Sequence, residues 1–137
     1  MAPKSTPTSV FVYGTLKPGE VNHARYCSGA VAQPAIAYGQ LYALPAGYPA
    51  MTETVKGGPV YGYLLRFYDP ARLKHLDALE DYHPKRPKEE NEYYRRRRSI
   101  FTVAGEPIGS AWIYFMTPQR VHRMGGIALP QGRWTGG

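Results

Sequence analysis

The carboxylate of Glu80 stands in a sequence setting suited to proton transfer. Glu80 follows Leu73 and Leu76 at the spacing i, i+3 and i+7, which places the three side chains on one face of a helix. If the leucines are buried, the carboxylate is drawn toward the core with them. Burial without a cationic partner raises the pKa of a carboxyl group, and a raised pKa suits a general acid or base near neutral pH.

The same helix carries a second acid, Asp77, that the spacing does not exclude. At ~100° per residue, Glu80 projects ~20° from Leu73 and Asp77 projects ~40° from it. Glu80 also stands at the end of the helix, where it could turn to solvent or pair with one of the arginines at 95–98. The spacing alone does not choose between the two acids.

A glycine ends the first apolar run of the chain, and the loop after it is the second candidate for chemistry. Gly14 follows residues 10–13, and Thr15 and Leu16 complete the turn. A backbone without a Cβ can approach a ligand closely, and amides that leave a sheet can point at a carboxylate or an oxyanion. We expect Tyr13, Gly14, Thr15 and Leu16 to bind such a group, although an ordinary strand-to-loop turn is the alternative. Neither G-x-G-x-x-G nor G-x-x-x-x-G-K-[ST] occurs in the chain.

The elements that would position these residues are mostly short strands. The pattern predicts strands at 10–13, 38–44, 60–68, 93–104 and 109–116, with the first buried on both faces. Asp69-Pro70 predicts the start of a helix over 70–80, and Asn22 the cap of a short helix over 22–28. Gly62 marks a bulge or a close backbone approach. We expect an α+β fold, a small mixed β-barrel or strongly curved sheet with a few packed helices.

The chain of 137 residues is long enough for one domain. Residues 1–9 are expected to form a flexible tail, 10–117 the domain, and 118–137 a C-terminal extension with little order. Cys27 is the single cysteine, so the chain can form no internal disulfide, and zinc-ligand spacings are missing. No secretory h-region and no apolar run near the ~20 residues of a membrane span are visible. We therefore expect a cytoplasmic protein that has no membrane partner.

The positive charge of the chain is concentrated in one segment. The net charge is +7, and Arg95, Arg96, Arg97 and Arg98 supply four charges in a row. Successive residues of a strand face opposite sides, so Arg95 and Arg97 should share one face and Arg96 and Arg98 the other. We expect at least one pair to be solvated, or paired with acids such as those at 89, 90 and 92. A nucleic-acid surface is the alternative, but no known nucleic-acid module is visible, so we expect no nucleic-acid partner.

Several short segments, in order along residues 10–116, together resemble the gamma-glutamylcyclotransferase-like family, especially its short branch that includes gamma-glutamylamine cyclotransferase. The opening V-F-V-Y-G-T-L is similar to the family's F-x-Y-G-[ST]-L, and L-D-A-L-E-D-Y at 76–82 to its L-D-x-[LF]-E-[GD]-Y. The other matching segments are Asn22-His23, G-Q-L-Y-A-L at 39–44, G-Y-P-A at 47–50, Y-R-R at 94–96 and A-W-I-Y at 111–114.

The resemblance implies a cofactor-independent and metal-independent enzyme. It would convert a gamma-glutamyl amine or gamma-glutamyl amino acid into 5-oxoproline and release the amine. Glu80 would be the acid/base residue, the loop Tyr13–Leu16 would line the same cavity, and the Tyr94 hydroxyl would assist at its mouth. A non-catalytic small-molecule binding protein of the same fold is the alternative, and the oligomeric state stays open.

The chain departs from the family pattern at two positions. The family often has Glu after the glycine of V-x-G-E, where this chain has Tyr63, and Gly-Asp-Trp near its end, where this chain has Arg133. Neither position is the expected base. We expect both departures to affect substrate preference or shape more than chemistry. The leaving group stays open between free amino acids, a lysine side chain from crosslinked protein, and a biosynthetic amine.

Overall fold

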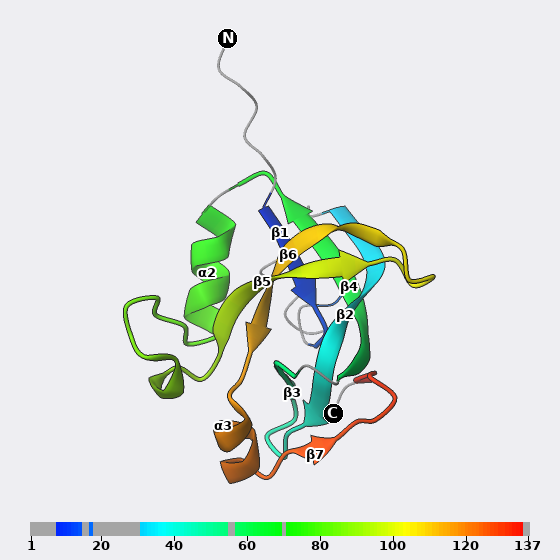
Figure 1. The fold of residues 1–137 in the computed structure, drawn as a ribbon. Helices are drawn as coiled ribbons and strands as arrows, with labels where there is room; N and C mark the ends of the chain where they lie inside the picture. The colour runs from blue at the N-terminus through cyan, green and yellow to red at the C-terminus, as the bar shows by residue number, and fades with distance from the viewer. Residues whose placement is uncertain (1–7, 15–16, 18–30, 55–56, 70, 136–137) are drawn as a thin grey trace.

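Five strands close into a small barrel in the computed structural model, which describes residues 8–14, 17, 31–54, 57–69 and 71–135 (Figure 1). The strands follow the order β2-β4-β1-β6-β5, and β5 returns to β2 through the pairing of Ile36 with Phe101. Strands β1 and β6 are parallel, and the other barrel pairs are antiparallel. The expected α+β fold with a mixed barrel is thus confirmed. The bounds are Thr8–Val12 (β1), Val31–Ala43 (β2), Gly58–Phe67 (β4), Tyr94–Phe101 (β5) and Pro107–Phe115 (β6).

The smaller elements lie around this barrel. Helix α2 (Ala71–Leu79) lies beside it, whereas α3 (Pro118–Arg123) and β7 (Ile127–Ala128) lie at one end together with β3 (Pro49–Thr52) (Figure 1). Both β3 and β7 pair with the last residues of β2. A short 3-10 helix, η1 (Lys88–Glu90), interrupts the charged loop before β5. No helix among the described residues is long and apolar enough to cross a bilayer.

The expectation of little order after residue 117 is wrong for the described part of that segment. Helix α3 begins there because the Thr117 side chain accepts a hydrogen bond from the amide of Arg120 at 3.2 Å, with Pro118 in the first turn. Strand β7 then pairs with β2. Its two residues are too few to show the alternation of apolar and polar residues that would predict a strand from the sequence. The helix expected over 22–28 lies outside the described residues.

Strand β1 is buried on both faces, as its apolar sequence predicts. Phe11 and Tyr13 point into the barrel interior, and Val10 and Val12 belong to a second apolar cluster on the other face. Leu76 of α2 is fully buried in this second cluster. The helix therefore packs over β1, close to the point where β1 ends.

A close approach between β1 and β4 explains the glycine in the middle of β4. A Cβ built on Gly62 would stand 2.1 Å from the carbonyl oxygen of Val12. Real Cβ atoms do not approach so near, so this position accepts only glycine without a shift of the strands. The predicted close backbone approach at Gly62 is confirmed.

Candidate active site

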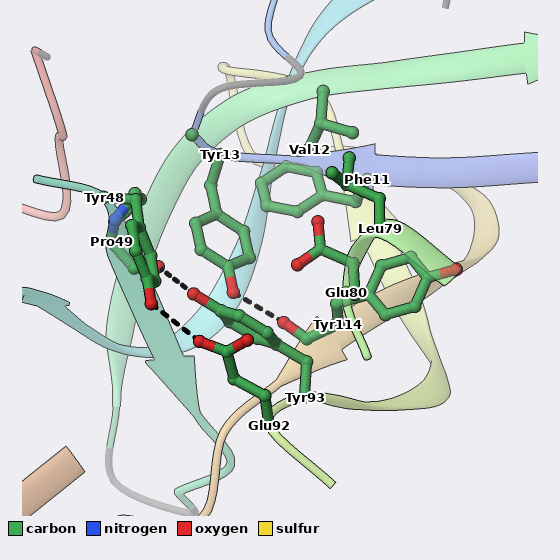
Figure 2. A pocket seen from close by; sticks show the side chains of 11 residues that line it. Phe11, Val12, Tyr13, Tyr48, Pro49, Leu79, Glu80, Glu92, Tyr93 and Tyr114 are labelled. Atoms are coloured by element: carbon green, nitrogen blue, oxygen red, sulfur yellow. Dashed lines mark hydrogen bonds between the residues drawn. The ribbon is translucent and has the colours of Figure 1, made fainter. Parts of the chain in front are cut away.

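A pocket of about 290 Å³ opens where β1 ends beside the last turn of α2 (Figure 2). This volume suits a small molecule rather than a polymer. Within the described residues, five parts of the chain form its wall: residues 11–14, Tyr48 with Pro49, Leu79 with Glu80, Glu92 with Tyr93, and Tyr114. The fold thus brings Tyr13, Gly14 and Glu80 together, as the sequence predicts.

Glu80 is placed by the way α2 starts and ends. The Asp69 carboxylate accepts a hydrogen bond from the Ala71 amide at 2.9 Å and caps the helix. At the other end, the amide of Tyr82 donates to the carbonyl of Asp77 at 2.8 Å, and Asp81 adopts a left-handed φ of 54°. This pair of features is a Schellman-type C-terminus. The helix therefore ends in a defined geometry at Glu80 and does not leave that residue in a loose final turn.

The carboxylate of Glu80 is directed into the pocket and accepts no hydrogen bond from any described residue (Figure 2). Its backbone carbonyl accepts a hydrogen bond from the Tyr93 amide at 3.3 Å, which ties the helix end to the approach to β5. Burial, together with a smaller contribution from the nearby charge of Glu92, raises the pKa of Glu80 from 4.5 to about 8. The side chain keeps partial exposure through the pocket mouth, so a bound ligand can reach it.

Asp77, the other candidate acid, is engaged elsewhere. Its carboxylate accepts two hydrogen bonds from the Arg95 guanidinium, at 2.8 and 3.2 Å, and one from the Tyr114 hydroxyl at 2.5 Å. Arg95 in turn lies over the Trp112 ring, 4.3 Å from its centroid. Asp77 does not line the pocket. A carboxylate held in this way is an anchor between α2 and the barrel, which leaves Glu80 as the acid that faces the cavity.

Tyr114 links the two halves of the site. Its hydroxyl donates to Asp77 on α2, and its backbone carbonyl accepts the Tyr13 hydroxyl at 2.6 Å (Figure 2). Burial raises the pKa of both phenols above the ordinary value. Both hydroxyls therefore stay neutral donors. The end of β1 and the end of α2 are thus held to the same residue of β6.

The wall opposite Glu80 contains residues that the sequence does not single out. The Tyr93 hydroxyl donates to the carbonyl of Pro49 at 2.7 Å, and the Tyr48 hydroxyl donates to Glu92 Oε2 at 2.7 Å. Burial and the Glu92 hydrogen bond raise the pKa of Tyr48 to about 12. Glu92 is one of several acids in the same charged loop, so the sequence does not show which of them lines the pocket. Tyr48, in contrast, falls within the G-Y-P-A segment that carries the family resemblance.

The loop after β1 is described only in part. Gly14 is buried, and a Cβ there would stand 2.6 Å from the Pro49 ring, so a neighbouring side chain already explains the glycine. Its carbonyl accepts a hydrogen bond from the Lys17 amide at 3.0 Å, which closes a turn. Thr15 and Leu16 lie outside the described residues. The binding of an anion by this loop stays a prediction.

Tyr94 lies away from this pocket. It is buried in the barrel interior, and its hydroxyl donates to Glu53 at 2.7 Å. The neighbouring Tyr93 lines the pocket instead. Adjacent residues at the start of a strand face opposite sides, so an error of one residue in the expected register exchanges the two tyrosines.

The arginine run alternates between faces, as expected. Arg95 and Arg97 both lie over Trp112, whereas Arg96 and Arg98 both pair with Glu53. The sequence predicts that at least one pair is solvated or paired with acids such as those at 89, 90 and 92. Arg96, Arg97 and Arg98 are exposed, and these three acids form no ion pair with the run among the described residues. The loop that carries them turns away before β5 begins, while Glu53 at the end of β3 reaches the same face.

No group of three His, Cys, Asp or Glu side chains that could hold a metal ion occurs in the described part of the chain. The two positions that depart from the family pattern lie outside the pocket. Tyr63 is half-buried on β4, and the Arg133 guanidinium lies 3.9 Å from the centroid of the Tyr61 ring.

Comparison with known proteins agrees with this geometry. Residues 10–136 match the family described as Gamma-glutamyl cyclotransferase, AIG2-like. The chain belongs to this family. A Halalkalibacterium halodurans protein, provisionally named a gamma-glutamylcyclotransferase, is 34% identical over 97 residues, which cover 71% of this chain and 78% of the relative.

Solved structures share the fold at lower identity. A mouse AIG2-like protein is 20% identical with a TM-score of 0.69, and the match covers 96% of this chain and 90% of the mouse chain. YkqA of Bacillus subtilis is 24% identical with a TM-score of 0.67. That match covers 94% of this chain and only 40% of YkqA. The fold therefore occurs both as nearly a whole chain and as part of a longer one.

Proposed function

We propose that this protein cyclises the gamma-glutamyl group of a small amide to 5-oxoproline and releases the amine, with Glu80 as the general acid and base. The observation that carries the proposal is the Glu80 carboxylate, which is desolvated, accepts no hydrogen bond from the described residues and faces a cavity of small-molecule size. Membership of the family supports a gamma-glutamyl substrate.

The raised pKa of Glu80 matches the first proton transfer of this reaction. The nucleophile is the substrate's own α-amine, which must lose a proton before it attacks the γ-carbonyl. The pKa of such an α-amine is about 8 or somewhat higher. Transfer to a carboxylate of pKa 4.5 would be uphill, whereas transfer to Glu80, with its pKa of about 8, is nearly balanced. The difference is worth on the order of 5 kcal/mol.

The second proton transfer uses the same residue in the opposite direction. Protonated Glu80 can donate to the leaving nitrogen as the tetrahedral intermediate collapses. The pocket wall would hold the substrate folded so that amine and carbonyl meet, which makes the attack intramolecular. Amides of the loop after Gly14 would hold the α-carboxylate or the oxyanion.

Release of 5-oxoproline from a panel of gamma-glutamyl amines and amino acids tests the proposal. Glu80→Gln should retain the shape of the site and lower kcat by about two to four orders of magnitude, because it removes the proton carrier. Asp77→Asn should retain turnover wherever the variant is folded. Wild-type turnover in Glu80→Gln would rule out the assignment, and loss confined to folded Asp77→Asn would move the role there.

A binding protein without turnover is the second candidate. The absence of 5-oxoproline with every compound, together with measurable binding of one of them, would favour it.

A further inference from the structure

The pocket is lined by acidic side chains in a protein whose net charge is +7. Glu80 and Glu92 both line it, and no lysine or arginine among the described residues does. Glu92 lies near enough to Glu80 for its charge to contribute to the raised pKa of Glu80. A ligand that fills this space should therefore bring positive charge with it.

A hydrogen bond orients the Glu92 carboxylate through one of its two oxygens. Tyr48 donates to one oxygen, Oε2, and no described residue donates to the other. No ion pair joins Glu92 to a described cation. Arg120 is near enough to lower the pKa of Tyr48, but its guanidinium donates to the Glu89 carbonyl at 3.3 Å and stays outside the pocket wall. The second oxygen of Glu92 is thus not engaged by any residue that the structure describes, and a ligand can donate to it.

The charges of a gamma-glutamyl substrate do not balance this pocket. The glutamyl part brings one ammonium and one carboxylate, and the proposed reaction moves a proton from that ammonium to Glu80. Glu92 then has no counter-charge among the described residues of the wall, which are largely tyrosine and apolar side chains. An anionic leaving group would be repelled, and a cationic one would be attracted at a site of reduced dielectric.

We infer that Glu92, oriented by Tyr48, is a specificity-determining residue that selects gamma-glutamyl compounds whose leaving amine carries an additional positive charge, such as a diamine. The inference rests on the proposed function for the glutamyl half of the ligand. Glu92 lies outside the sequence segments that carry the family resemblance, so the preference would belong to this chain and not to the family signature.

Three compounds with the same number of methylenes test this inference. They are the N-γ-glutamyl derivatives of 1,4-diaminobutane, n-pentylamine and 5-aminopentanoate, which end in an ammonium, a methyl and a carboxylate. Binding is measured by calorimetry in a Glu80→Gln background, where turnover should be slower by about two to four orders of magnitude and residue 80 is neutral. The series is repeated with shorter and longer chains, so that a mismatch of length is not read as a lack of preference.

The diamine compound should bind about tenfold or more tightly than the methyl compound, a difference of ~1.4 kcal/mol, and the carboxylate compound should bind weakest. Adding Glu92→Gln should bring the ratio of the affinities for the diamine and methyl compounds near one. Adding Glu90→Gln, which removes the same charge from an exposed position of the same loop, should leave the ratio unchanged. Tyr48→Phe should reduce the ratio, because Glu92 loses its orienting hydrogen bond.

Equal affinity for the three compounds at every chain length would overturn the inference. So would a uniform loss with Glu92→Gln, since that result places the residue at the α-ammonium that all three share. Failure of the proposed function is a separate result. It would appear as wild-type protein that releases no 5-oxoproline, whereas the charge preference in binding would still be measured.

Discussion

The raised pKa of Glu80 predicts that this residue destabilises the fold it occupies. In the unfolded chain, Glu80 should titrate near its ordinary pKa of 4.5, and in the folded protein near about 8. Between these values the folded state holds a proton that the unfolded state has lost, so the free energy of unfolding falls as pH rises through this window. Glu80→Gln removes the titrating group and should therefore stabilise the protein.

The size of the effect follows from the two pKa values. The full difference corresponds to on the order of 5 kcal/mol above about pH 8 and to about 3 kcal/mol at pH 7, and it vanishes below about pH 4.5. Water that enters the open pocket mouth will reduce these values, so we expect an observed gain of ~2 kcal/mol at pH 7. Wild type would thus be less stable by this amount because it holds a functional acid in an apolar site, which is a usual trade-off between stability and activity.

Urea unfolding of wild type and Glu80→Gln, followed by circular dichroism from about pH 5 to about pH 9, measures this difference. The stability gain should grow with pH and level off near pH 8. Glu90→Gln is the control, because that acid is exposed and its removal should give a small difference that does not vary in this window. A gain for Glu80→Gln that is flat with pH, or a loss at every pH, would refute the claim that Glu80 is desolvated.

Three further predictions concern the scaffold and the charged surface. Asp77→Asn leaves Arg95 without its buried partner and should lower the free energy of unfolding by about 3–5 kcal/mol, measured by urea denaturation; a loss below about 1 kcal/mol would contradict the anchoring role. Gly62→Ala places a Cβ against the backbone of β1 and should destabilise by about 1–3 kcal/mol in thermal unfolding, whereas Gly58→Ala, where a Cβ would meet nothing within 4 Å, should not show this loss. Arg97→Gln should change stability by less than about 1 kcal/mol and leave 5-oxoproline release intact, with no RNA retained on a filter by either protein; salt-sensitive RNA binding that disappears with the arginine would revive a nucleic-acid role.

Local patterns were sufficient for the parts of the fold that depend on neighbours in sequence. The helix before Glu80 follows from Asp69-Pro70 and the leucine spacing, and β1 follows from its apolar run. Thr117-Pro118 is a comparable local start signal for α3. Strands β3 and β7 have no such signal, because they are short and exist through pairing with β2.

The sequence by itself determined that Glu80 and Gly14 end two elements with apolar faces, because periodicity and capping are properties of adjacent residues. It left Asp77 and Glu80 equivalent, since both project toward the same side of one helix. Only the tertiary structure separates them. Barrel closure brings Arg95 and Tyr114 to Asp77, whereas Glu80 faces the cavity with no hydrogen-bond donor from the described part of the chain. The same closure brings Tyr48, Glu92 and Tyr93 to the opposite wall, because pairings between strands distant in sequence decide which side chains meet.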